Sequence, residues 1–343
     1  MRNPRTWLGF AVSAAAIYFL FSSFDLSELG GRLAAANPWL VIACVATLPL
    51  AMWAKAYRWQ WYFPRRADAS LYGLNAALCI GYMANTVLPL RIGELVRAYV
   101  LSESERLPKA TVIATILVEK VLDITTIALF LFVLRFILPF EPALDRIALL
   151  AGLGVAAVVV GIALLLAARD WMLGLIGRIE QRFGLVSKLH PVEILTPLID
   201  GFQFARDPRL LAINVTLAIV TWFASGVTSH LGFGAVGIWV PYSVTMWVVV
   251  ATNLGMVVPA APGYVGVFHY TVVWALSQFG VDREAAGAAA IIIHAAVFGM
   301  FIVLGSYFAL FGRQAGGGFG ALIARAKASE ASSVTDPRLS ADR

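Results

Sequence analysis

The chain has 343 residues, 60% of them hydrophobic and 13% charged, with a formal net charge of +6 at pH 7. Its mean hydropathy of +0.81 lies well outside the range of soluble globular proteins, and its continuous apolar stretches argue against a β-barrel. The basic residues cluster between these stretches, as the positive-inside bias requires, so the charge does not indicate nucleic-acid binding.

The composition predicts an all-α polytopic membrane protein, because several apolar stretches approach the ~20 residues that a helix needs to span a bilayer. Two arginines precede the apolar run over residues 7–24, which predicts an uncleaved first span with its amino end in the cytoplasm. A second span is expected over residues 38–57. The basic and aromatic cluster at its end, which includes Lys55 and Arg58, predicts a cytoplasmic interface.

A proline and several charged residues interrupt the next apolar stretch. Residues 71–90 predict an apolar arm that ends just after the proline, and residues 93–102 predict a short charged helix. The second arm is too short and too charged for a comfortable full crossing, so a re-entrant hairpin is expected. A long span over residues 111–138, a loop outside the membrane over residues 140–146 and a returning span over residues 149–168 follow.

Residues 169–209 form the longest polar region before the carboxyl-terminal tail and are rich in arginine. They predict a cytoplasmic linker that carries an amphipathic helix on the membrane surface. A span over residues 210–236 then leads outward, and a second broken segment covers residues 242–279. The last span is expected over residues 285–311.

The charge pattern predicts that the two broken stretches enter the membrane from opposite faces. Because the polar regions on both sides of it are expected inside, the stretch over residues 70–105 begins and ends at the cytoplasmic face. Counting the membrane crossings in the second half in the same way places both ends of residues 241–280 outside. About six full spans and two opposed hairpins predict an inverted repeat, as in many transporters. Residues 1–312 then form one membrane domain, and residues 313–343 form a disordered cytoplasmic tail.

The first break carries Pro89, Arg91, Gly93, Glu94 and Arg97. Proline removes a backbone donor and glycine permits unusual dihedral angles, so one helix can end and another begin at membrane depth. The freed amides and the two arginines favour an anionic group, for which a lipid phosphate is the natural candidate. The alternative is an interfacial loop whose arginines extend to lipid headgroups without transporting them.

Three ionisable residues, Glu119, Lys120 and Asp123, lie inside the expected long span. The two acids are four residues apart and share one helical face, and such groups inside a span almost always face protein or water. Their expected partners are one another, Arg91 or Arg97. A structural ion-pair network, a direct contact with substrate and a proton relay all remain open.

The second break contains Pro259, Pro262, Gly263, Gly266 and His269. Pro262 and Gly266 repeat the four-residue spacing of the proline and glycine in the first break. His269 can change charge near neutral pH and so sense or relay a proton. The alternative is a packed histidine that is hydrogen-bonded to a neighbour.

The remaining histidines and the cysteines in the apolar stretches are expected to be packed core residues. His230 and His294 are isolated on apolar helices, and His294 is the better candidate for a cavity. Cys44 and Cys79 have neither the spacing of a metal site nor that of a disulfide framework. The sequence contains no nucleotide-binding loop, so neither a cofactor nor ATP-driven transport by this chain is expected.

Three segments resemble the lysylphosphatidylglycerol synthase transmembrane-region family, namely LPLRIGELVRAYVL (88–101), VEKVLDI (118–124) and APGYVGVFHY (261–270). They are similar to the family's Pro-x-Arg-x-Gly-Glu-x-x-Arg, Glu-(Arg/Lys)-x-x-Asp and Pro-Gly-(Gly/Tyr)-x-Gly-x-x-(Glu/His) segments. The resemblance runs over residues 5–312. His269 stands where many relatives carry an acid, so any role of that carboxylate does not transfer.

The resemblance implies a protein of the bacterial or archaeal cytoplasmic membrane, related to the flippase half of the multiple peptide resistance factor. Such a protein moves a phospholipid or a lipid-linked molecule between leaflets, and a homodimer or a lipid-modifying enzyme partner is compatible with it. We expect no enzyme activity, because no aminoacyl-transferase domain follows the membrane region. The alternatives are a membrane enzyme that modifies a lipid headgroup and a non-transporting partner of a lipid enzyme.

Overall fold

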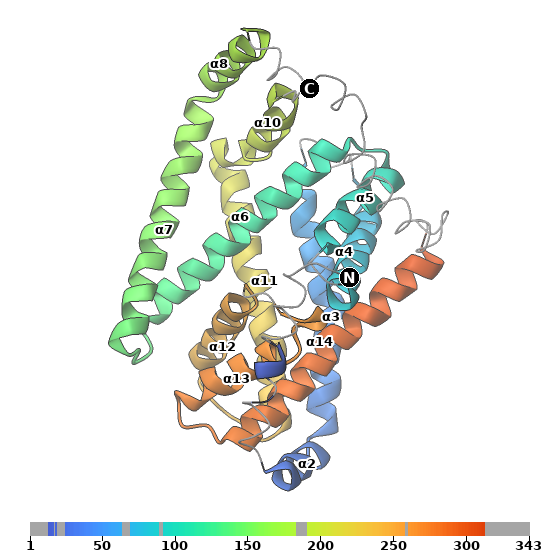
Figure 1. The fold of residues 1–343 in the computed structure, drawn as a ribbon, viewed down its shortest axis with the longest axis vertical. Coiled ribbons are helices and arrows are strands. Elements are labelled where there is room, and N and C mark those ends of the chain that lie inside the picture. The colour runs from blue at the N-terminus through green and yellow to red at the C-terminus, as the bar shows by residue number, and fades with distance from the viewer. Residues whose placement is uncertain are drawn as a thin grey trace, which may run out of the picture.

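A computed structural model describes most of the chain, namely residues 13–16, 18, 25–63, 69–88, 92–182, 191–257 and 260–312. Every regular element in these ranges is a helix (Figure 1). Four of these helices are long and apolar enough to cross a membrane: α3 (Pro38–Gln60), α7 (Pro142–Ala167), α11 (Pro208–Ala235) and α14 (Arg283–Phe311). The prediction of an all-α, multi-pass membrane protein is confirmed at this level. Most of the expected first span lies outside the described residues.

The first broken segment is a helical hairpin of α4 (Leu71–Val87) and α5 (Gly93–Glu105). The hydroxyl of Ser70 donates to Glu105 Oε1 at 2.5 Å and so joins the two open ends of the hairpin. A Cβ atom at Gly81 would lie 2.9 Å from the carbonyl oxygen of Gly93, so the two arms approach too closely there for any side chain. The break begins at Leu88, whose backbone is extended.

The second broken segment is a hairpin of α12 (Tyr242–Gly255) and α13 (Val267–Ser277), with the short 3-10 turn η4 (Pro262–Tyr264) between them. Gly263 has φ +70° and Gly266 has φ +89°, values that glycine adopts at no steric cost. A Cβ atom at Gly263 would lie 3.5 Å from the carbonyl oxygen of Thr86, near the end of α4. The two breaks, far apart in sequence, therefore meet.

The helix α6 (Lys109–Leu134) crosses the bundle diagonally and is joined to α7 at the lower left of Figure 1. Arg135 donates to both oxygens of Asp145 at 2.9 Å across this connection. The sequence predicted a loop up to residue 146, but α7 already begins at Pro142. Proline suits the first helical position, and the carboxylate of Asp145 favours the first turn.

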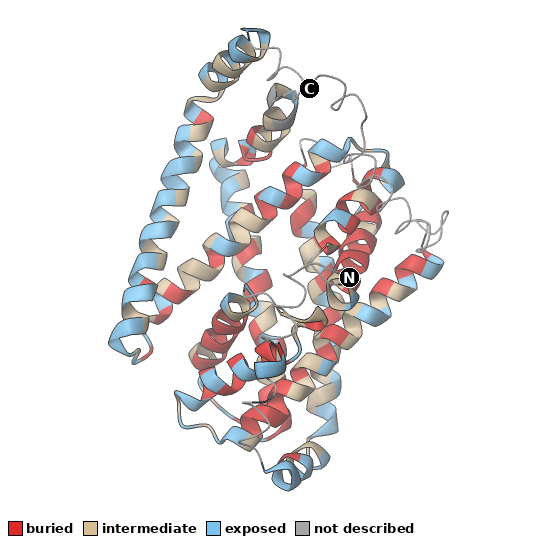
Figure 2. Cartoon of the chain, in the orientation of Figure 1, coloured by how far each residue is buried: buried red, intermediate tan, exposed pale blue. Residues whose placement is uncertain are grey.

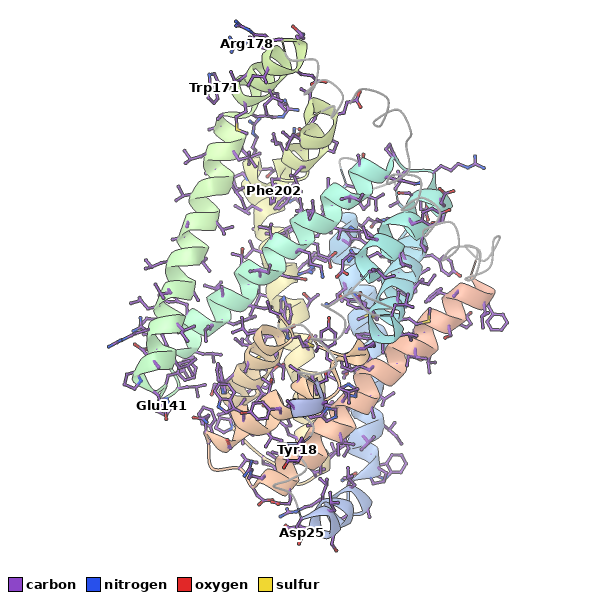
Figure 3. All side chains as sticks on the ribbon, viewed as in Figure 1. Tyr18, Asp25, Glu141, Trp171, Arg178 and Phe202 are labelled. Carbon is purple, nitrogen blue, oxygen red and sulfur yellow. The ribbon has the colours of Figure 1, made fainter. Side chains whose placement is uncertain are left out.

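The opposite end of α7 leads into the polar region, which forms α8 (Arg169–Arg182), α10 (Pro191–Asp200) and the 3-10 turn η3 (Gln203–Arg206). Arg169 Nη2 lies 2.7 Å from Asp200 Oδ1, which joins α8 to α10, and this hydrogen bond raises the pKa of Arg169. The side chains of Trp171 and Arg178 point away from the bundle at this end (Figure 3). Trp171 is 65% exposed, in keeping with a helix at a membrane surface.

A short helix, α2 (Leu26–Ala34), lies at the other end of the molecule, where Arg32 Nη2 pairs with Asp282 Oδ2 at 3.2 Å just before α14. The buried residues concentrate in the two hairpins and the facing side of α14, whereas α7 is largely exposed (Figure 2). Only Ala148 and Leu166 of α7 are buried. Its apolar surface therefore suits contact with lipid, and the two hairpins form the core.

Candidate functional site

A cavity of about 830 Å³ lies where the two hairpins meet α3, α6 and α11. Its lining changes along α6, from Lys120 and Asp123 to the apolar segment from Ile127 to Leu131. These positions span ~16 Å of helix at 1.5 Å per residue. Ile147 and Leu150 of α7 continue the apolar wall. The cavity thus has a charged end and a long apolar part, which matches the division of a lipid into headgroup and chains.

The first break supplies Glu94 to the charged end. Its Oε1 pairs with Lys120 Nζ at 2.7 Å, and its Oε2 accepts a hydrogen bond from Asn85 Nδ2 at 3.2 Å. Asn85 also accepts from the backbone N–H of Gly93 at 2.8 Å. One asparagine side chain therefore joins the end of α4 to the beginning of α5 and orients the cavity carboxylate.

A second layer of charge lies deeper, between α3, α5 and α6. Arg97 forms an ion pair with Glu119, and its guanidinium lies 3.5 Å from the centre of the Trp59 ring. Arg58 Nη2 lies 3.5 Å from Glu119 Oε1 and 2.7 Å from Asp123 Oδ1. Buried charges of this kind persist when they are paired and hydrogen-bonded.

Asp123 connects this layer to the cavity, because it lines the cavity and pairs with Arg58. Its Oδ1 also accepts a hydrogen bond from the indole Nε1 of Trp222 on α11, at 3.2 Å. Glu119 and Arg97 are 2% and 4% exposed and do not line the cavity. Arg97, for which the sequence suggested either an anionic ligand or a carboxylate partner, is therefore buried in a pairing with Glu119.

The placement of Arg58 differs from the interfacial position expected from the sequence. Its relative exposure is 0%, because α3 continues as a helix to Gln60 and turns this side chain toward α6. Lys55, three residues earlier on the same face, lines the charged end of the cavity and donates to the hydroxyl of Tyr82 at 3.0 Å. This three-residue spacing indicates from the sequence that the two side chains share a helical face, but it does not show which way that face points.

The second break contributes differently. His269 does not line the cavity, and its ring centre lies 4.6 Å from that of His294 on α14. His294 Nε2 is 2.8 Å from the carbonyl oxygen of Gly263, and its ring stacks on Phe298 at 4.2 Å. His294 thus supports the backbone where the helix is interrupted, and His269 packs beside His294.

The structure brings together Glu94, Arg97, Glu119, Lys120 and Asp123 from the predicted set. The glycines Gly93, Gly263 and Gly266 and the proline Pro262 lie at the two breaks, as predicted. Pro89, Arg91 and Pro259 lie outside the described residues.

Comparison with known proteins identifies a family and a relative. The family described as "Lysylphosphatidylglycerol synthase TM region" matches residues 6–305. The chain is also similar to a protein named "Glycosyltransferase AglD" from Haloferax volcanii, at 27% identity over 339 residues. That alignment covers 87% of this chain and 53% of the relative, so the chain spans about half the length of that protein.

Proposed function

This chain belongs to the lysylphosphatidylglycerol synthase transmembrane-region family, and from that premise we propose that it moves a phospholipid or a lipid-linked molecule between the leaflets of the membrane. The family predicted from the three motifs is confirmed. The observation that carries the proposal is the cavity of about 830 Å³ with its charged end and apolar wall.

Physical chemistry explains why such a cavity suits this task. Moving a charged headgroup into hydrocarbon has a large free-energy cost, whereas lipid chains are themselves hydrocarbon and enter it without that cost. The charged end offers polar contacts from Glu94, Lys120 and Asp123, and the segment from Ile127 to Leu131 offers apolar surface. A lipid in the cavity keeps both of its parts in a compatible environment during the crossing.

In the proposed mechanism, the two hairpins form an inverted repeat within a membrane domain of about six full spans. Both termini of the chain are cytoplasmic. Movement of the α4–α5 hairpin against the α12–α13 hairpin then opens the cavity to each leaflet in turn. The close approach of Thr86 and Gly263 supports this, because it gives the two breaks a shared contact beside the cavity. The proposed location is a bacterial or archaeal cytoplasmic membrane.

The orientation has a direct test. A single cysteine in place of Arg178, which is exposed on α8, should react with a membrane-impermeant maleimide only from the cytoplasmic side. The native Cys44 and Cys79 are buried and provide a low background. Reaction from the outer side contradicts the proposed topology.

Transport is tested with the purified protein in vesicles that contain fluorescent phosphatidylglycerol and a quencher restricted to the outside. Wild-type protein should increase the fraction of lipid that becomes quenched. Ala151→Trp, which places an indole in the cavity, should slow exchange about tenfold, whereas Ala157→Trp on the exposed face of α7 should not. Exchange no faster than in protein-free vesicles, or equal exchange by both variants, overturns the proposal.

The name of the Haloferax relative favours a second candidate, an enzyme or enzyme component that transfers a sugar. Mass spectrometry of lipid recovered from the same vesicles distinguishes the two. A transporter returns the lipid with its mass unchanged, whereas an enzyme supplied with its donor changes the headgroup mass. Exchange seen only after addition of a lipid enzyme indicates a partner role.

A further inference from the structure

The charged end of the cavity has an unequal balance of charge among the described residues. Four cations and three carboxylates gather there within the network that joins α3, α5 and α6, namely Lys55, Arg58, Arg97, Lys120, Glu94, Glu119 and Asp123. One positive charge therefore remains without a matching carboxylate. In a membrane interior, such a surplus favours an anionic ligand.

The pairings identify which cation carries the surplus. Glu94 is held by Lys120 at 2.7 Å, Asp123 is held by Arg58 at 2.7 Å, and Glu119 pairs with Arg97. Lys55 forms no ion pair with a carboxylate in the described part of the chain. Its side chain lines the cavity, whereas each of the other three cations in the cluster is paired with a carboxylate.

The direct contacts of the Lys55 ammonium are with neutral aromatic residues. Its Nζ donates to the hydroxyl of Tyr82 at 3.0 Å, and it lies 5.3 Å and 5.6 Å from the ring centres of Tyr82 and Trp222. Aromatic rings stabilise an ammonium without neutralising it. An ammonium has three N–H donors, of which Tyr82 takes one, so two remain for a ligand.

We infer that Lys55, with Tyr82 and Trp222, is the site that binds the phosphate of the transported molecule. This inference rests on the proposed transport of a lipid, because the apolar wall from Ile127 to Leu131 receives the chains. It replaces Arg97 as the phosphate ligand, since Arg97 is buried against Glu119. The bound phosphate completes the charge balance that the protein alone leaves open.

The inference is tested by binding to purified protein in detergent, with four probes. These are dihexanoyl-phosphatidylglycerol, dihexanoylglycerol, glycerol phosphate and inorganic phosphate. Wild-type protein should bind the phospholipid at least tenfold more tightly than any other probe, since only the phospholipid has both chains and phosphate. Equal binding of inorganic phosphate indicates a soluble anion, and equal binding of dihexanoylglycerol indicates no phosphate contact. Either result overturns the inference.

The variants are Lys55→Met, Lys55→Arg and a matched control that removes a cavity ion pair without changing net charge, Glu94→Gln with Lys120→Met. Lys55→Met should weaken phospholipid binding about tenfold or more, because hydrogen bonds to charged groups contribute that much. Lys55→Arg should stay within about threefold of wild type. The paired control should lose less than Lys55→Met. An unchanged affinity in Lys55→Met, or a larger loss in the control, overturns the assignment.

Measuring both binding and lipid exchange distinguishes a failure of this inference from a failure of the proposed function. Lys55-dependent binding without lipid exchange in vesicles rejects transport and keeps the phosphate site. Exchange that Lys55→Met leaves at the wild-type rate, with unchanged binding, keeps transport and rejects the site. The melting temperatures of Lys55→Met and Lys55→Arg test whether each variant is folded. If Lys55→Met is not folded, the comparison is made with Lys55→Arg.

Discussion

Replacing Arg58 with methionine keeps most of the apolar length of the side chain and removes its charge. Arg58 is fully buried, and its Nη2 lies 2.7 Å from Asp123 Oδ1 and 3.5 Å from Glu119 Oε1. The substitution leaves Asp123 without its cation, and it leaves Glu119 with Arg97 as its partner among the described residues. A buried carboxylate that loses its cation is strongly unfavourable.

The two distances set the size of the effect. At an effective dielectric constant of about 20, unit charges at 2.7 Å and 3.5 Å attract each other by ~6 and ~5 kcal/mol. The loss of hydration of the charges offsets much of this attraction, and removal of one member of a buried pair costs about 3–5 kcal/mol. We expect Arg58→Met to lower the free energy of unfolding by that amount.

The measurement is unfolding in mixed detergent micelles, followed by near-ultraviolet circular dichroism. Arg178→Met, an exposed change on α8, is the control and should lie within about 0.5 kcal/mol of wild type. Addition of Asp123→Asn to Arg58→Met should recover part of the loss, because it removes the unpaired carboxylate. A loss below about 1 kcal/mol for Arg58→Met, or no recovery in the double variant, refutes the buried pairing.

Three further predictions concern stability. Gly81→Ala should lower the melting temperature, because its Cβ would lie 2.9 Å from the opposing arm, whereas Gly154→Ala, with no atom within 4 Å, should not. His294→Leu should cost about 1–2 kcal/mol in chemical unfolding through the lost hydrogen bond to Gly263, and a neutral result contradicts that role. Asp200→Asn should cost less than about 1 kcal/mol, since partly exposed ion pairs contribute little, and a larger loss shows that the α8–α10 contact is structural.

Local patterns in the sequence located most of the elements and both breaks. The first hairpin was predicted over residues 71–90 and 93–102 and is found as Leu71–Val87 and Gly93–Glu105. Hydropathy and the Pro/Gly signals act within a few residues along the chain, so they need no knowledge of distant partners. The same locality explains the main error in helix bounds, the start of α7 at Pro142, because the proline and acidic residues of this segment predict a loop when only neighbouring residues are considered.

The partners of the charged residues depended on distant contacts. The sequence indicated that Glu119 and Asp123 share a face and require cations, and it named Arg97, which pairs with Glu119 in the structure. It did not identify Arg58, which the structure places between these two carboxylates, or Lys55, which the structure turns into the cavity. Basic residues near a span end look alike in sequence whether they meet headgroups or protein, because only the packing of α3 against α6 decides which way they point.

By itself, the sequence determined that this is a helical membrane protein, that its helices break at two places, and that its family is recognisable from three motifs. The tertiary structure alone decided that the two breaks meet, that His269 packs beside His294, and that Lys55 is the cation of the described charged cluster without an ion pair to a carboxylate. The reason is physical. Hydropathy and helix breaking are properties of short segments, whereas charge balance is a property of the residues that folding brings together.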